Sequence, residues 1–347
     1  MAECHRAREN IDLSKRQPDF SLISSARFIR FQGWAMKRGL CVAAVITVLL
    51  GGCVSWSVDE SWFFKPVVRA QKAMTVADLK LDAEERLTQR GAFSADFSRI
   101  FPNFADRVPA RISHDFVTLA GERIAITRVA GANGSGDESL IVHCGGESGD
   151  RRSHGTVYAG KILPWGEALL MDYPGYGDSS GQPTIGAMLA FQAGMASYLD
   201  GVAGSRPLIL WGHSLGGPVC AAIAGQSRQV DAVILEAAAP NFSEVMDARK
   251  PWFTPPTLQL ELAEGLKSYD VAAALDDFSG PIMVLGAGRD DISPVVLARS
   301  LAAKLRRQGL AVTYLEYAAA DHMNSALNGF FVRDALGFFA NVSNSRH

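Results

Sequence analysis

Gly212-His213-Ser214-Leu215-Gly216-Gly217 is the most informative stretch of this 347-residue chain. It follows the apolar run 207–211 and precedes the helix-forming run 218–224, so a G-x-S-x-G pattern lies at a strand-to-helix junction. Such a junction is typical of a nucleophile elbow, a turn so tight that only glycine fits two places before and after the serine. The pattern predicts that the Ser214 hydroxyl stands above a sheet edge, and that the Leu215 N–H at the helix start stabilises an oxyanion.

A serine becomes a good nucleophile only beside a general base, which in this arrangement follows it in the chain, after an acidic residue. The sequence has two histidines beyond Ser214, namely His322 and His347. His322 comes just after the β-rich run 311–317, in a loop at the carboxyl end of a strand, where the catalytic groups of open α/β sheets gather. We therefore predict that His322 is the base.

The acid of the triad has three candidates in the sequence. The apolar run 281–285 leads into a loop that contains Asp290 and Asp291, and an aspartate there would hold the imidazole in the productive tautomer. We favour Asp290, and expect Asp291 to cap the helix that begins near Pro294. Glu236, at the end of an earlier strand, is the third candidate.

A second oxyanion donor is expected from a glycine-rich loop. The apolar strand 139–144 ends in Gly145-Gly146-Glu147-Ser148-Gly149, where a backbone N–H can approach a substrate carbonyl closely. Gly146 is the predicted donor, and Glu147 is the alternative.

Together these residues resemble the α/β-hydrolase superfamily in chain order, over about residues 115–340. The stretch 169–183, Leu-Leu-Met-Asp-Tyr-Pro-Gly-Tyr-Gly-Asp-Ser-Ser-Gly-Gln-Pro, is similar to the D-x-R-G-x-G-x-S-x-G loop of the branch that contains Bem46-like and monoacylglycerol-lipase-like serine hydrolases. The family spacing to Pro294 also favours Asp290. Two departures stand out: Pro174 replaces the usual arginine, and Cys144 stands where relatives have histidine, with His143 one place earlier.

The order of the remaining elements predicts the same α/β fold. Strand-like runs occur at 115–119, 122–129, 138–144, 167–172, 207–212, 232–237, 281–286 and 311–317, and helical stretches at 151–163, 184–203, 215–227, 294–307 and 323–340. We expect an eight-stranded, mostly parallel sheet with helices on both faces, and a hairpin at Gly121. In the hydrolase domain 111–347, residues 241–280 are too short for a cap domain and are expected to form a short lid with Trp252 and Phe253.

Composition excludes several classes of function. The formal net charge of −2 and the 48% hydrophobic content are typical of a globular domain and give no nucleic-acid signal. The sequence offers no phosphate cradle and no cluster of metal ligands, so we expect no cofactor. Its oligomeric state is left open.

The amino terminus carries a second strong signal. Met36-Lys37-Arg38 precedes the apolar run 39–50 and then Gly51-Gly52-Cys53, which predicts a secretory signal peptide over residues 36–52. Leu50-Gly51-Gly52-Cys53 resembles the lipobox of bacterial lipoproteins, which implies lipidation of Cys53 and, since Val54 is not aspartate, an outer-membrane location facing the periplasm. Residues 1–35 would then be a non-native extension. The alternative is an uncleaved membrane anchor over residues 39–56.

The other cysteines give no disulfide framework. Cys144 and Cys220 lie in apolar surroundings, so we expect free buried thiols, with a disulfide between them as the alternative. Residues 53–110 are expected to be a linker with helical segments, among them 78–87.

The sequence thus predicts a membrane-tethered serine hydrolase that cleaves carboxylic esters or thioesters through an acyl-enzyme on Ser214. Its expected partners are a small-molecule acyl substrate and the membrane, without nucleic acid. An acyltransferase or a serine peptidase on the same fold is an alternative. A non-catalytic lipoprotein scaffold is disfavoured, because serine, histidine and aspartate are all present.

Overall fold

The computed structural model describes residues 54–66, 75, 111–131, 138–250, 254, 258–327 and 329–344. The chain divides into two compact units, one of residues 1–56 and 250–259 and one of residues 57–249 and 260–347. Ser214, Asp290 and His322 belong to the second unit. The predicted signal peptide with Cys53, the extension 1–35, the stretch 78–87, Trp252-Phe253 and His347 lie outside the described residues.

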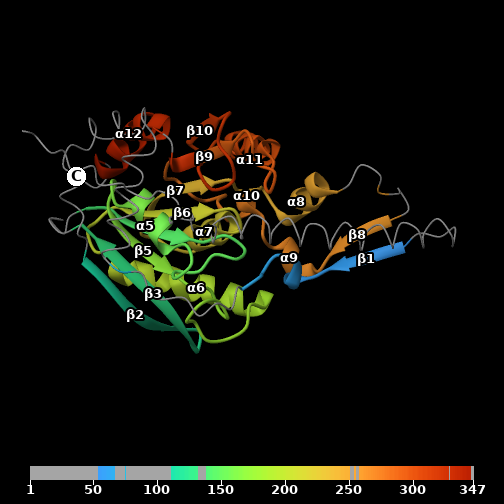
Figure 1. Ribbon diagram of the computed structural model, residues 1–347, viewed down its shortest axis with the longest axis horizontal. Coiled ribbons are helices and arrows are strands. Elements are labelled where there is room, and N and C mark those ends of the chain that lie inside the picture. The colour runs from blue at the N-terminus through green and yellow to red at the C-terminus, as the bar shows by residue number, and fades with distance from the viewer. Residues whose placement is uncertain are drawn as a thin grey trace, which may run out of the picture. The chain divides into compact units, whose positions relative to one another are not determined.

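An eight-stranded sheet organises the second unit, in the order β10-β9-β7-β6-β4-β5-β3-β2 (Figure 1). The strands are β2 (Arg111–Leu119), β3 (Glu122–Ala130), β4 (Leu140–Cys144), β5 (Glu167–Met171), β6 (Leu208–His213), β7 (Val230–Glu236), β9 (Ile282–Ala287) and β10 (Val312–Tyr317). Of these eight, β3 alone runs against the others, since it pairs antiparallel with both β2 and β5. The predicted mostly parallel sheet is confirmed.

The edge of the sheet formed by β2 and β3 is a tight hairpin. Ala120 has φ 49° and Gly121 has φ 85°, the two positive values that a type I′ turn needs to match the twist of its strands. The register then pairs Leu119 with Glu122. The predicted hairpin at Gly121 is confirmed.

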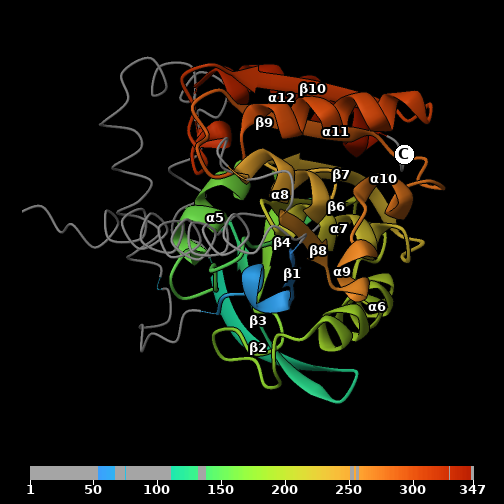
Figure 2. The same ribbon diagram turned by 90° about the vertical axis from the view of Figure 1, so that its right-hand side faces the viewer.

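Helices cover both faces of the sheet, because both faces of its strands are apolar. One face packs against α5 (Gly155–Ile162) and α12 (Gly329–Asn344), the other against α6 (Ile185–Val202), α7 (Gly216–Ala224), α10 (Val271–Ala274) and α11 (Val295–Arg307). Figure 2 shows α6 and α12 near opposite edges of the sheet. In β6, Ile209 and Trp211 face the first layer while Leu208 and Leu210 face the second. Each of these fully buried side chains contributes roughly 1.5–3 kcal/mol.

The stretch 241–280 contains short elements, and its role as a lid stays a prediction. These are α8 (Phe242–Arg249), β8 (Leu258–Leu262), α9 (Glu264–Lys267) and α10. Strand β8 pairs with β1 (Val54–Val58) in a separate two-stranded sheet. Among the described residues, no helix is both long enough and apolar enough to span a bilayer.

The start of the expected linker 53–110 is ordered structure. It contains β1 and the 3-10 helix η2 (Glu60–Trp62), and the side chains of Val58, Phe63 and Phe64 are buried. Phe63 stacks on Phe242 with ring centroids 4.0 Å apart. Its partner lies about 180 residues further along the chain, so the local sequence pattern alone did not reveal this packing.

Candidate active site

The nucleophile elbow has the backbone that its glycines predict. Ser214 has φ 55°, in the left-handed region that non-glycine residues rarely adopt. Its N–H donates to the Glu236 carbonyl at 2.8 Å, which fixes the turn to the end of β7. A Cβ on Gly212 would lie 2.3 Å from the Gly216 carbonyl oxygen, and one on Gly216 would lie 2.0 Å from that of Cys144. Glycine is therefore required at both positions.

The structure brings the predicted acid and base together. His322 Nδ1 lies 2.8 Å from Asp290 Oδ2, and both side chains are buried. The other carboxylate oxygen, Asp290 Oδ1, accepts the N–H groups of Ile292 at 2.9 Å and Ser293 at 2.7 Å. Two backbone donors thus orient the carboxylate, and the carboxylate orients the imidazole.

The other two acid candidates take different positions. Asp291 is exposed, and α11 starts after Pro294 without a side-chain cap, so the predicted capping role of Asp291 is wrong. The loop N–H groups next to it bind Asp290 instead. Glu236 is fully buried and binds Lys161 Nζ, Trp211 Nε1 and Ser325 Oγ rather than the imidazole of His322.

His213 links the base to the elbow. Its Nε2–H donates to the His322 carbonyl at 2.7 Å, and the two imidazole centroids are 4.8 Å apart. Because a carbonyl only accepts, this bond fixes the proton of His213 on Nε2. Burial lowers the pKa of His213 to about 3, so the side chain is neutral. The predicted base, His322, therefore lies beside His213, the residue that precedes Ser214. The Ser214 hydroxyl has no protein hydrogen-bond partner among the described residues.

Two tyrosines hold the glycine-rich loop 145–149. The Tyr173 hydroxyl donates to the Gly145 carbonyl and that of Tyr176 to the Glu147 carbonyl, each at 2.8 Å. A third, Tyr158, lies beside the loop; burial raises the pKa of its hydroxyl, and the nearby Gly146 N–H partly offsets that rise. The carbonyls of Gly145 and Glu147 are thus both fixed by tyrosine hydroxyls.

The position of this loop bears on the two predicted oxyanion donors. A Cβ on Gly146 would lie 3.6 Å from Ser214 Cβ, so the loop adjoins the predicted nucleophile. The Gly146 N–H lies near the Tyr158 hydroxyl, while the Glu147 N–H donates to no protein acceptor within the described residues. Gly146 as the donor, with Glu147 as the alternative, stays a prediction.

Comparisons with known proteins agree with this architecture. Residues 192–346 match the Prolyl oligopeptidase family. An esterase, Est1E from Butyrivibrio proteoclasticus with bound ferulic acid, superposes with a TM-score of 0.53 at 14% identity, over 65% of this chain and 98% of that one. The Pyrococcus furiosus esterase Pf2001 superposes with a TM-score of 0.51 at 14% identity, over 70% of this chain and 92% of that one. The chain has the α/β-hydrolase fold.

Curated relatives of this chain match over part of their length. Lysophosphatidylserine lipase ABHD12 of Danio rerio is 27% identical over 47% of this chain and 46% of its own. An uncharacterised protein of Mycobacterium tuberculosis is 28% identical over 50% of this chain and 59% of its own length. The chain thus spans about half the length of the curated relatives it matches.

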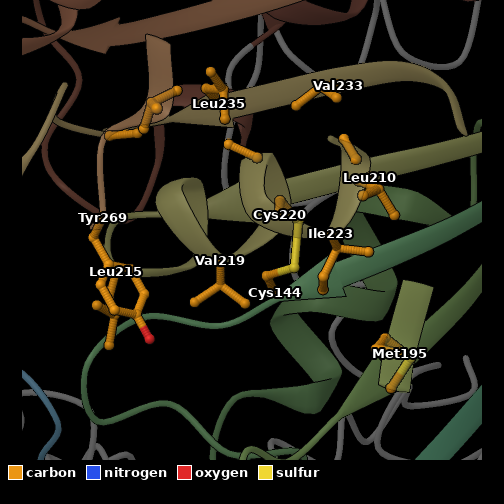
Figure 3. Close-up of a cluster of buried hydrophobic side chains, with 14 of the residues drawn as sticks. Cys144, Met195, Leu210, Leu215, Val219, Cys220, Ile223, Val233, Leu235 and Tyr269 are labelled. Carbon is orange, nitrogen blue, oxygen red and sulfur yellow. A yellow bond between two sulfur atoms is a disulfide. The ribbon is translucent and has the colours of Figure 1, made fainter. Parts of the chain in front are cut away.

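A disulfide lies directly behind the turn at Ser214. It joins Cys144, the last residue of β4, to Cys220 in α7, with Cα atoms 6.1 Å apart (Figure 3). The expectation of free thiols is therefore wrong, and the alternative of a disulfide holds. The pairing follows from the departure from the family pattern noted above, in which Cys144 stands where relatives have histidine. Cys144 faces α7, while His143 points to the opposite face and stacks on Tyr158 at 3.9 Å.

The loop after β5, which contains Pro174, is organised around a buried carboxylate. The carboxylate of Asp172 is fully buried and accepts the Arg151 N–H, the Arg151 Nε–H and the Asp178 N–H, at 2.7, 3.0 and 3.0 Å. Gly177 has φ 47°, and a Cβ there would lie 2.3 Å from Asp172 Oδ2. Arg151, from the segment after the glycine-rich loop, is thus the cation that pairs with Asp172 in the loop that contains Pro174.

Proposed function

We propose that the protein is a serine hydrolase that cleaves carboxylic ester or thioester bonds, with Ser214 as nucleophile, His322 as base and Asp290 as the acid that orients it. The observation that carries this proposal is the hydrogen bond between His322 Nδ1 and Asp290 Oδ2, formed beside a left-handed serine in a G-x-S-x-G turn. The ester-cleaving relatives and the esterases of the same fold support the reaction class.

The proposed reaction proceeds in two acyl-transfer steps. Ser214 Oγ attacks the carbonyl carbon while His322 Nε2 takes its proton, and the charge that develops on the carbonyl oxygen is bound by the N–H of Leu215 and a loop N–H. His322 then protonates the leaving alcohol or thiol. Water, deprotonated by His322, releases the acid from the acyl-enzyme and restores Ser214.

The proposal includes a location outside the cytoplasm. The Cys144–Cys220 disulfide supports export, because structural disulfides persist in oxidising compartments and are rare in the cytosol. Lipidation of Cys53 in the lipobox, with an outer-membrane destination, is the form of tethering that we favour. The uncleaved anchor over residues 39–56 is the alternative.

A serine peptidase is the second candidate function, favoured by the match of residues 192–346 to the Prolyl oligopeptidase family. The same triad would attack an amide, with His322 protonating the leaving amine. Hydrolysis rates on matched ester and peptide substrates with the same acyl group would separate the two functions.

A fluorophosphonate probe tests the proposed nucleophile. We expect covalent labelling of Ser214 in the folded protein and none in Ser214→Ala, as mapped by mass spectrometry. The unlabelled enzyme should hydrolyse a panel of esters of increasing acyl length, and labelling should abolish that activity. The panel includes lysophosphatidylserine, because the ABHD12 relatives carry that activity in their names. Labelling that persists on another serine of the alanine variant would remove Ser214 from the mechanism.

A further inference from the structure

We propose that the segment 57–66 is a working part of the active site, because its Lys65 holds the oxyanion loop and so positions the Glu147 N–H as the second oxyanion donor. This inference rests on the proposed function. It assigns a positioning role to residues that the sequence pattern placed in a linker.

The segment is fixed on the hydrolase unit by several independent contacts. Asp59 caps η2 by accepting the Ser61 N–H at 3.0 Å, and the Val58 carbonyl accepts the Ala263 N–H at 2.9 Å. Phe63 stacks on Phe242 at 4.0 Å, and Phe64 meets Tyr269 edge-on at 6.1 Å. With both phenylalanines buried, the segment has a defined position just before it reaches the loop.

Lys65 then contacts Glu147 twice. Its backbone N–H donates to the Glu147 carbonyl at 3.0 Å, and its ammonium lies 3.5 Å from Glu147 Oε2. The ion pair is partly exposed and contributes little, so the backbone bond is the contact that matters. The Tyr176 hydroxyl donates to the same carbonyl at 2.8 Å.

Glu147 combines a fixed carbonyl with an N–H that is available to a substrate. The Gly146 carbonyl accepts the Gly149 N–H at 3.2 Å, which closes the loop around Glu147. Glu147 is therefore held at its carbonyl from the side of Lys65 and Tyr176, while its N–H donates to no described residue. A donor that is fixed before substrate binds costs no reorganisation in the transition state.

Removal of this support should weaken transition-state binding more than ground-state binding. A single hydrogen bond contributes roughly 0.5–1.5 kcal/mol, which corresponds to about a two- to ten-fold change in rate. We therefore expect kcat to fall by about that factor, with KM nearly unchanged, when either donor to the Glu147 carbonyl is removed.

The test compares variants that differ in one donor. Lys65→Pro deletes the backbone N–H, while its control Lys65→Ala removes the ammonium and keeps the N–H. Tyr176→Phe removes the second donor without changing shape, with Tyr198→Phe as a control on α6. The readouts are kcat and KM on a short-chain nitrophenyl ester, the affinity for a boronic acid that forms a tetrahedral adduct, and fluorophosphonate labelling of Ser214.

We expect Lys65→Pro and Tyr176→Phe to lose kcat and boronate affinity by the same factor, and both controls to stay near wild type. If Lys65→Pro does not fold, Tyr176→Phe decides alone. Wild-type kcat and boronate affinity in Tyr176→Phe, or an equal loss in Lys65→Ala and Lys65→Pro, would overturn the inference. A wild-type protein that is not labelled at Ser214 would instead overturn the proposed function.

Discussion

Replacement of Asp290 by asparagine should disable the base without moving it. In Asp290→Asn the side-chain oxygen can still accept the N–H groups of Ile292 and Ser293, at 2.9 and 2.7 Å, so the side chain should keep its place. The amide nitrogen then takes the position of Oδ2, 2.8 Å from His322 Nδ1. An amide nitrogen donates, so Nδ1 must accept and the imidazole proton moves to Nε2.

The expected loss is large because the new tautomer cannot take the serine proton. The negative charge that stabilises imidazolium is lost as well. Together these changes should lower kcat by about 10³ to 10⁴, which at about 1.36 kcal/mol per factor of ten is about 4 to 5.5 kcal/mol of transition-state stabilisation. The free energy of unfolding should change far less, since the backbone contacts of the side chain remain.

Steady-state kinetics on a nitrophenyl ester, with urea unfolding in parallel, measures both quantities. Asp291→Asn is the matched control, because it makes the same chemical change one residue away at an exposed side chain. It should leave both kcat and stability near wild type. A large loss of kcat in Asp291→Asn, or nearly full activity in Asp290→Asn, would refute the assignment of the acid.

Three further predictions concern stability and processing. Because burial lowers the pKa of His213 from 6.5 to about 3, the unfolded chain takes up a proton below pH 6.5 that the folded chain does not, so the unfolding free energy falls as pH falls from 6.5 towards 3. The loss should be about 2 kcal/mol at pH 5, and His213→Gln should lack it in urea titrations at pH 7 and 5. The paired change Cys144→Ala with Cys220→Ala should lower the unfolding free energy by about 2–4 kcal/mol, and an unchanged denaturation midpoint would contradict this. Expressed in a Gram-negative host, the protein should be cleaved before Cys53 and lipidated there, and Cys53→Ser should accumulate uncleaved; an intact, unlipidated amino terminus on the membrane-bound protein would favour the anchor instead.

The sequence predicted the strands and the pairing of Asp290 with His322 well, because both follow from local signals. A short, continuous apolar run such as Leu140–Cys144 is typical of a strand that is buried on both faces of a sheet, and this run is such a strand. The glycines of the G-x-S-x-G pattern allow the tight turn at Ser214. The loops after parallel strands lie at the same edge of the sheet as this turn, because the carboxyl ends of parallel strands lie side by side. Asp290 and His322 were therefore found from their places in the chain.

Features that depend on pairing between distant residues were not predictable in the same way. Tyr173 and Tyr176 hold the glycine-rich loop from the stretch after β5, and the sequence alone does not reveal these two hydroxyl bonds. The cap expected from Asp291 failed because the competing carboxylate one residue earlier binds the same loop. The apolar side chains of Phe63 and Phe64 are of a kind that is usually buried. The neighbouring sequence, however, does not identify Phe242 and Tyr269 as the residues that they contact.

The Cys144–Cys220 bond has a consequence for how the protein must mature. Both cysteines are 0% exposed, and the bond lies between the central strand β4 and the elbow helix. A small oxidant or an oxidoreductase cannot reach either sulfur once α7 is packed on the sheet. The thiols must therefore be oxidised while the chain is still partly open, which ties the order of assembly to the compartment in which the chain emerges. Chain that closes first in a reducing environment would retain two thiols that later exposure to oxidant does not join.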